Sequence, residues 1–237
     1  MPQFKILTIL LAIGFLAQGC KENTKRIPGF EVHGIDVSHY QKNINWETIA
    51  TQEIAFAFVK ATEGESISDS LFQQNWEGLT KNCIRKGAYH YFHPATNVRN
   101  QFENFKCQVQ FEKGDLPPVI DIEETNGKSK EEVIKSINEW IYLVETDFKV
   151  KPIIYTNFKF YNAYIIGNFD QYPIWIANYT YREPTLDFGD SWTFWQYGNR
   201  GRIKGIEGDV DFNVFNGSLL DLDNLIHNIE RSDPLLN

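Results

Sequence analysis

Short apolar runs alternate with longer amphipathic stretches along most of this chain. The short runs are rich in β-branched and aromatic residues, as strands are, whereas the longer stretches repeat apolar residues three or four positions apart, as helices do. No linker, low-complexity stretch or internal repeat interrupts residues 30–220. This regular alternation indicates a parallel α/β domain.

The pattern predicts eight strands, at residues 33–37, 55–60, 87–92, 118–123, 151–156, 173–177, 191–197 and 208–212. It predicts helices at residues 46–50, 71–85, 98–111 and 130–146, a short helix after residue 156, and a C-terminal tail that is one helix from Ser218 and then frays. The gaps between the last three strands are too short for crossover helices, and the glycines of residues 198–207 suit a hairpin. The expected fold is therefore a modified (β/α) barrel with eight strands and about five helices, whose last strands are joined without crossover helices.

The first nineteen residues have the pattern of an export signal. Lys5 precedes an apolar run at residues 6–16, which is too short to cross a bilayer and ends in Ala17-Gln18-Gly19-Cys20. This resembles a bacterial lipoprotein signal that is cut before Cys20. We therefore expect a signal peptide at residues 1–19, a lipid-bearing Cys20 that begins a tether at residues 20–29, and a folded domain at residues 30–237. Such a protein would be exported and anchored to a membrane, on its periplasmic face or at the cell surface.

Charge and cysteine content narrow the possible partners. The formal net charge of −8 argues against nucleic acid as a partner, because nucleic-acid binding needs a basic footprint. Besides Cys20 the chain has Cys83 and Cys107, which in an oxidising compartment could form a disulfide or stay as two free buried thiols. Nothing in the sequence indicates an obligate partner, so a monomer is expected.

Two acids close the apolar strand predicted at residues 118–123. Asp121 and Glu123 point to the same face of such a strand, roughly 6–7 Å apart. In a barrel the site lies at the carboxyl ends of the strands, where Asp36 ends the first strand and Asp211 lies in the last, neighbouring strand. Four carboxylates are thus expected to converge on one cleft. Carboxylates with divided pKa values suit acid catalysis on a glycosidic bond, and an ion pair or a solvated strand end is the alternative.

Several segments, in order, resemble the muramidases of glycoside hydrolase family 25. They are residues 33–38 with Gln41, 58–64, 87–92, 118–123, 154–157, 174–177, 195–197 and 210–213, and the resemblance covers about residues 31–220. It implies a catalytic domain that cuts the β-1,4 bond between N-acetylmuramic acid and N-acetylglucosamine in the glycan strands of peptidoglycan. Hydrolysis of another N-acetylhexosamine polymer such as chitin, and a catalytically silent wall-binding lipoprotein, are the alternatives.

The resemblance also assigns roles to the acids. Glu123 matches the general acid, and Asp121 the neighbouring carboxylate that assists the substrate's acetamido group or stabilises positive charge. Asp36 and Asp211 match the other cleft acids, and Tyr155 a ring hydroxyl near the reaction centre. The three neighbouring acids should raise the pKa of Glu123. Either an enzyme carboxylate or the substrate's own acetamido group could attack.

Further cleft residues are expected around these acids. Lys60 could reach a substrate carboxylate or hydroxyl, or form an ion pair with Glu63. Tyr91 and Trp175 could form sugar-stacking walls or pack in the core, and Gln196 could donate to a sugar or satisfy a buried neighbour. The histidines lack a metalloprotease-type arrangement and no phosphate-binding loop is present, so we expect no catalytic metal and no cofactor.

Overall fold

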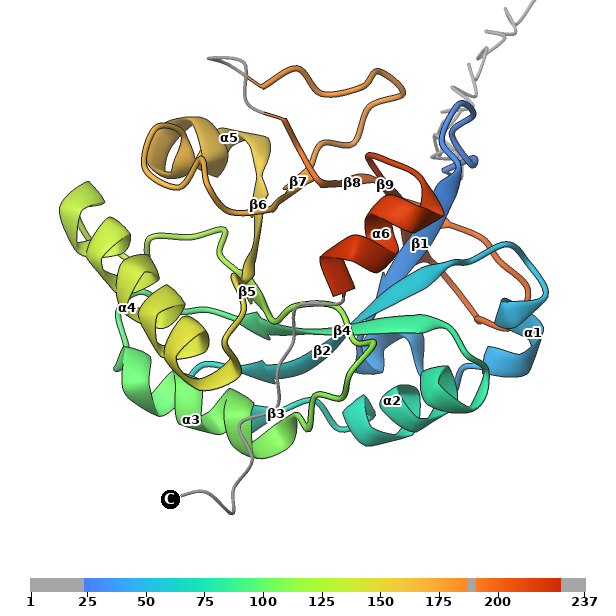
Figure 1. The fold of residues 1–237 in the computed structure, drawn as a ribbon, viewed down its shortest axis with the longest axis horizontal. Coiled ribbons are helices and arrows are strands. Elements are labelled where there is room, and N and C mark those ends of the chain that lie inside the picture. Colours follow the sequence, from blue (N-terminus) through green and yellow to red (C-terminus); the bar gives the residue numbers. More distant parts are fainter. Residues whose placement is uncertain (1–23, 187–190, 227–237) are drawn as a thin grey trace, which may run out of the picture.

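The computed structural model describes residues 24–186 and 191–226, so the predicted signal peptide and Cys20 lie outside the described residues. Within them, eight strands close into a barrel (Figure 1). In barrel order they are β1 (Val32–Val37), β2 (Phe56–Glu63), β4 (Arg85–Tyr91), β5 (Val119–Asp121), β6 (Ile153–Asn157), β7 (Ile174–Ala177), β8 (Phe194–Gly201) and β9 (Val210–Phe215).

The barrel is parallel except at its closing strand. β9 pairs antiparallel with both β8 and β1, so the last two strands form the hairpin that the glycine-containing gap predicts. A two-residue strand, β3 (Ile67–Ser68), pairs antiparallel with the end of β2 and was missed in the sequence because it is too short to show a period. The predicted barrel, closed without crossover helices at its end, is confirmed.

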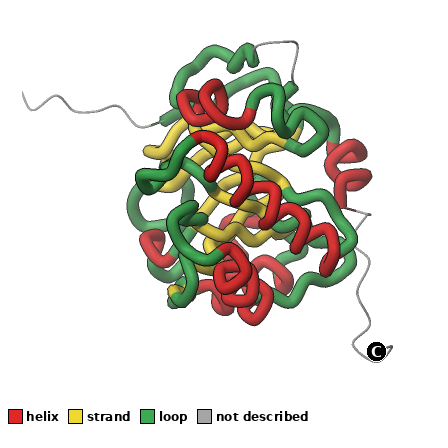
Figure 2. The backbone as a smooth tube through the Cα atoms, turned by 90° about the vertical axis from the view of Figure 1, so that its left-hand side faces the viewer, coloured by secondary structure: helices red, strands yellow, loops and turns green. Residues whose placement is uncertain are grey.

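Helices cover the outside of the barrel (Figure 2). They are α1 (Trp46–Ala50), α2 (Phe72–Lys81), α3 (Val98–Gln108), α4 (Lys130–Phe148), α5 (Phe158–Phe160) and α6 (Leu219–Ile226), with single turns η1 (His39–Gln41) and η2 (Tyr161–Ile165). The longest, α4, begins at a capping box in which Ser129 and Glu132 each bond the other's backbone amide. In the described part of the chain no helix is both long and apolar enough to span a bilayer.

Two apolar clusters, one on each face of the strands, hold the fold together. The inner cluster fills the barrel with side chains such as Phe56, Phe58 and Phe194, and α6 adds Leu222 at the end away from the cleft. The outer cluster packs the strands against the helices. Position 34 requires glycine, because a Cβ atom there would collide with the ring of Phe56.

The cysteine expectation is wrong in both of its forms. Cys83 and Cys107 are free, and both are exposed rather than buried. Cys83 follows α2, which ends earlier than predicted, and lies in a left-handed turn with a φ of 55°. Cys107 lies in the last turn of α3, on its exposed side.

Candidate active site

A cavity of about 240 Å³ opens at the carboxyl ends of the parallel strands. Its lining is mostly polar and aromatic: Asp36, Val37, Ser38, Tyr40, Gln41, Lys60, Tyr89, Tyr91, Asp121, Glu123, Tyr155, Trp175, Tyr179, Gln196 and Asp211. A larger cavity of about 540 Å³ lies at the opposite ends of β6 and β7, where Asp170 is the one acid among its described lining residues. The four predicted acids therefore meet in the smaller cavity, which is the candidate site and is hereafter called the cleft.

Asp36 and Asp211 lie side by side on neighbouring strands. They are directly opposed partners in the antiparallel β1–β9 pair, and their carboxyl groups are hydrogen-bonded to each other. Burial is the largest cause that raises the pKa of each, and the charge of Asp36 adds to the rise at Asp211. Two carboxyl groups that are hydrogen-bonded to each other share a proton, because ionisation of both would put like charges in contact.

Asp36 is further held by two amide side chains. Its Oδ2 accepts from Gln196 Nε2 at 2.8 Å and from Asn213 Nδ2 at 2.7 Å. Gln196 Oε1 in turn accepts from the Tyr155 hydroxyl at 2.9 Å, and Trp175 Nε1 donates to Asn213 Oδ1 at 2.8 Å. Asp36 is thus the centre of a buried, fully oriented hydrogen-bond network.

Asp121 ends β5, across the barrel from β9. It is 6% exposed, and its Oδ1 has no hydrogen-bond partner among the described residues. Burial and then the nearby Glu123 raise the pKa of Asp121 well above its ordinary value, with Lys60 acting in the opposite sense. A buried carboxyl oxygen without a partner is costly, so this atom is suited to accept a hydrogen bond from a bound ligand.

Glu123 lies two residues beyond the end of β5, not within the strand as predicted. Burial is the largest cause that raises its pKa, Asn157 Nδ2 opposes the rise by donating to Oε2 at 3.4 Å, and the exposed Glu124 adds to it. The predicted direction is confirmed. The largest cause at Glu123 is burial rather than the charge of the other three acids. The interaction among the acids is present in the other direction, because the charge of Glu123 raises the pKa of Asp36, Asp121 and Asp211.

A bulge in β2 brings Glu63 to the same side of the strand as Lys60. Lys60 shares the inward face of Phe58 and lines the cleft. The pairing of β2 with β4 then shifts register between Lys60 and Thr62, so Thr62 faces His90 on the helix side while Glu63 lies next to Lys60. Lys60 Nζ lies 2.6 Å from Glu63 Oε2 and 5.1 Å from the centre of the Tyr91 ring. The ion pair expected as the alternative for Lys60 is therefore present at the rim of the cleft.

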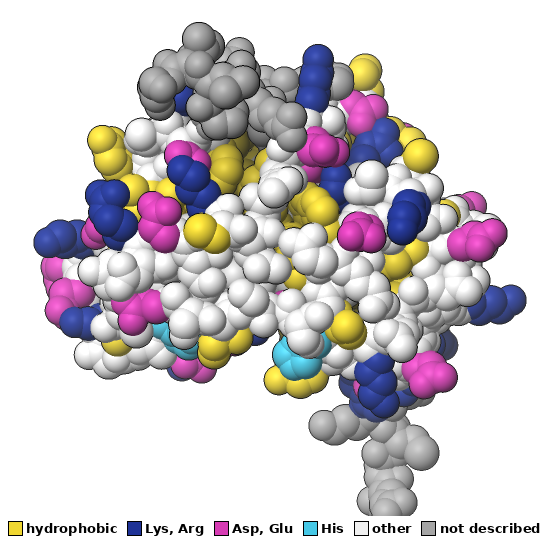
Figure 3. Space-filling view, turned by 90° about the horizontal axis from the view of Figure 1, so that it is seen from below, with side chains coloured by type: hydrophobic (Ala, Val, Ile, Leu, Met, Phe, Trp, Pro, Cys, Tyr) yellow, Lys and Arg dark blue, Asp and Glu magenta, His cyan; other side chains and the backbone are white. Residues whose placement is uncertain are grey.

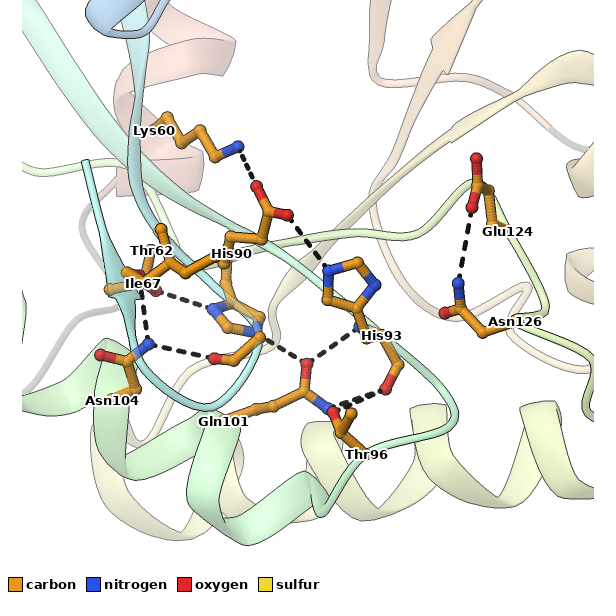
Figure 4. Close-up of polar contacts among 12 residues, drawn as sticks. Lys60, Thr62, Ile67, His90, His93, Thr96, Gln101, Asn104, Glu124 and Asn126 are labelled. Carbon is orange, nitrogen blue, oxygen red and sulfur yellow. Dashed lines mark hydrogen bonds and ion pairs between the residues drawn. The ribbon is translucent and has the colours of Figure 1, made fainter.

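The outer side of the same bulge is tied to α3 (Figure 4). His90 bonds Thr62 Oγ1 at 2.7 Å and Gln101 Oε1 at 3.1 Å, and its ring stacks on Trp140. Burial lowers the pKa of His90 to about 3, so the ring is neutral and structural. His93 instead contacts Glu63 Oε1 at 3.2 Å. Among the described residues, no three His, Cys, Asp or Glu side chains are grouped as metal ligands would be.

The structure also places the predicted binding residues. Trp175 is 1% exposed, and its ring stacks on Phe58 at 4.4 Å, which favours core packing over a sugar-stacking wall. Gln196 is engaged with buried neighbours, as its alternative predicts. Tyr91 is partly exposed on the cleft wall, and Tyr155 holds its hydroxyl inside the cleft.

Four residues of the site were not predicted from the sequence. Asn213 could have been found, because it follows Asp211 by two positions and so shares its strand face. Tyr89 shares a face with Tyr91 in the same way. Asn157, which begins the turn after β6, and Tyr179, whose hydroxyl donates to Gln196 Oε1 at 2.9 Å from the loop after β7, carry no periodic signal.

A closed barrel with a cluster of buried carboxyl groups at its mouth has the acids that hydrolysis of a glycosidic bond requires. The sequence model of the family described as "Glycosyl hydrolases family 25" matches residues 35–206. The chain belongs to this family.

Proteins of similar sequence or structure support membership of this family. The uncharacterized protein YegX from Escherichia coli (strain K12) is 41% identical over 213 residues, or 87% of this chain and 78% of its own. Lysozyme M1 from Streptomyces globisporus is 35% identical over 202 residues, covering 79% of this chain and 68% of its own. Among solved structures, a family 25 glycosyl hydrolase from Bacillus anthracis superposes with a TM-score of 0.80 at 35% identity, over 86% of this chain and 97% of that one.

Proposed function

We propose that the protein is a muramidase that hydrolyses the β-1,4 bond between N-acetylmuramic acid and N-acetylglucosamine in peptidoglycan. The observation that carries the proposal is that two acids lie in one cleft: Glu123, whose pKa is raised by burial, and Asp121, whose Oδ1 has no hydrogen-bond partner among the described residues. The relative named lysozyme M1 supports the choice of substrate.

The two acids divide the chemistry between them. Glu123 stays protonated to higher pH than a free carboxyl group and donates its proton to the leaving oxygen. Asp121 Oδ1 accepts the N–H of the substrate's acetamido group, or its charge stabilises the oxocarbenium-like centre. The attacking group is either that acetamido oxygen or an enzyme carboxylate, and both routes use Glu123 as the acid.

The ends of the product fragments test the substrate assignment. Purified peptidoglycan digested with the protein and then reduced with borohydride should carry its new reduced ends on N-acetylmuramic acid. Chitin oligomers under the same conditions should be cut much more slowly. New ends on N-acetylglucosamine, or cleavage of chitin alone, would contradict the proposed bond, and intact glycan from both would favour a silent wall-binding protein.

We also propose that a lipid on Cys20 anchors the exported enzyme to a membrane. The support is the sequence of residues 5–20, an apolar run after a lysine that ends at a cysteine preceded by a small residue. A Cys20→Ala variant should leave the membrane fraction and appear in the soluble fraction. Cys83→Ala removes a free, exposed thiol elsewhere and should stay with the membrane. Equal partitioning of the two variants would rule out lipidation at Cys20.

A further inference from the structure

We propose that Asp36 and Asp211 work as a dyad that holds one proton, and that the surrounding amides place this proton on Asp211. The dyad then carries a single negative charge, located on Asp36. This inference rests on the proposed function for its consequence in catalysis, but the position of the proton can be measured without any activity.

The backbone forces the two acids together. Asp36 and Asp211 are opposed residues of the β1–β9 pair, and both side chains point into the cleft. Like charges directly opposite each other destabilise a sheet, and a hydrogen bond between two carboxyl groups requires a proton on one of them. The pair therefore holds one proton at neutral pH.

Trp175 fixes the orientation of the first amide. Its indole N–H can only donate, and it points at Asn213 Oδ1 from 2.8 Å. The other end of Asn213 is therefore the NH₂ group, which donates to Asp36 Oδ2 at 2.7 Å. Because Trp175 is 1% exposed and stacked on Phe58, it cannot turn away and release Asn213.

Two hydroxyl groups orient the second amide in the same sense. Tyr155 and Tyr179 both donate to Gln196 Oε1 at 2.9 Å. Burial raises the pKa of both hydroxyls, so they remain protonated donors. Gln196 Nε2 is thereby turned to Asp36 Oδ2 at 2.8 Å.

The two acids of the dyad consequently differ. Asp36 accepts two N–H groups, which stabilise its ionised form. Asp211 has no amide donor among the described residues and faces the added negative charge of Asp209 and Glu123. The other titratable groups that line the cleft are Lys60 from β2, Tyr89 and Tyr91 from β4, Asp121 from β5, Tyr155 from β6, Tyr40 from η1 and Tyr179 from the loop after β7.

The arrangement favours an electrostatic role for Asp36. Its carboxylate accepts three hydrogen bonds, two from amides and one from Asp211, which lowers its power to attack a carbon atom. Its fixed charge still stabilises a positive centre. Asn213, Gln196 and Trp175 are then positioning residues that act through Asp36.

Two conservative substitutions separate the members of the dyad. Asp211→Asn replaces a protonated acid by a neutral group that can still donate to Asp36, so peptidoglycan hydrolysis should stay within about tenfold of wild type. Asp36→Asn removes the charge and should lower the rate by at least ~10²-fold, the usual size for a preorganised electrostatic group. Equal losses, or the reverse order, would overturn the assignment.

The pH profile tests the positioning residues. Trp175→Phe keeps the packing but frees Asn213 to turn its oxygen toward Asp36. The ionised form then loses a donor, the pKa of Asp36 rises, and the acid limb of kcat/KM should move up by about one pH unit. Trp195→Phe is the matched control, because Trp195 is equally buried but donates to the backbone oxygen of Asn178 outside the cleft. An acid limb that moves equally in both variants would contradict the role of Trp175.

The protonation states of Asp36 and Asp211 can also be measured directly in the wild-type protein, without any measurement of activity. Carboxyl ¹³C NMR of wild-type protein labelled at aspartate, with signals assigned through Asp36→Asn and Asp211→Asn, should show Asp36 ionised and Asp211 protonated near neutral pH. A protonated Asp36 beside an ionised Asp211 would overturn the inference whatever the enzyme cleaves. If Asp36 is ionised and Asp211 is protonated but no glycan is hydrolysed, the result would count against the proposed function alone.

Discussion

Glu123→Gln is expected to lower the rate of peptidoglycan hydrolysis by at least ~10²-fold, the usual contribution of a general acid. The amide keeps the shape of the side chain and can still accept from Asn157, but it has no proton of suitable acidity for the leaving oxygen. Turnover on purified peptidoglycan, measured from the release of reducing ends, checks the prediction.

The stability of the same variant separates a catalytic role from a structural one. Because burial raises the folded-state pKa of Glu123, ionisation of this group lowers the stability of wild type as the pH rises from the unfolded pKa through the folded one. Glu123→Gln removes that effect, so its Tm at pH 7 should equal or exceed that of wild type, and the difference should vanish in acid. A large drop in Tm would assign Glu123 to the structure instead.

Glu124 provides a matched control for this experiment. It is the next residue, it is exposed, and it contacts Asn126 outside the cleft (Figure 4). Glu124→Gln removes one negative charge near the same position and should change the rate by no more than about twofold, since exposed charges interact weakly through solvent. Equal losses in both variants would mean that the local charge, and not a positioned acid, supports turnover.

Lys86→Met should lower the free energy of unfolding by about 3–5 kcal/mol, the usual cost of breaking a buried ion pair. Lys86 and Asp115 are 6% and 3% exposed, their side chains form an ion pair, and Lys86 Nζ lies 4.6 Å from the centre of the Trp76 ring. The substitution leaves Asp115 buried beside one backbone donor, the N–H of Glu112 at 2.8 Å. Urea denaturation, with the midpoint lowered and the m-value unchanged, measures the loss.

The dependence of this loss on pH identifies its cause. Burial raises the pKa of Asp115 even with Lys86 present, and without the lysine the pKa should rise further. A raised folded-state pKa costs stability above the unfolded pKa, so the difference from wild type should shrink as the pH falls toward 4. Adding Asp115→Asn should restore much of the stability at pH 7. A loss that is the same at every pH would point to packing instead.

The exposed Lys81 is the control for Lys86. Its side chain is 75% exposed and lies 3.6 Å from Glu77, so Lys81→Met should change stability by less than about 0.5 kcal/mol. On the face of the molecule shown in Figure 3, basic and acidic side chains are interspersed.

The sequence revealed the barrel because its buried strands and amphipathic helices have clear periods. It placed Asp36, Asp121, Glu123 and Asp211 in one cleft through a general rule, that parallel strands bring their carboxyl ends to one mouth. The rule does not depend on where each strand ends, so Glu123 was correctly placed in the cleft although β5 ends at Asp121 and Glu123 lies beyond it.

The features that the sequence did not reveal depend on contacts distant in the chain. The bulge after Lys60 breaks the strict alternation of faces, so no periodicity argument could bring Lys60 and Glu63 to the same side. Trp175 looked suited to stack on a sugar because aromatic rings serve both purposes, and its burial depends on Phe58, from another strand. The orientation of Asn213 depends in turn on Trp175, which only the closed barrel brings within reach.

The antiparallel strand β9 has a consequence for when the enzyme can become active. The bond between Asn213 and Asp36 joins residues 177 positions apart, across the seam where β9 meets β1. Contacts of such high contact order form late and slowly in folding. A chain that has not yet docked β9 has β1 and β8 as open edges and lacks Asp211 in its cleft. The cleft is therefore complete only after β9 has docked between β8 and β1, so a truncated or still-emerging chain should be unable to cut glycan.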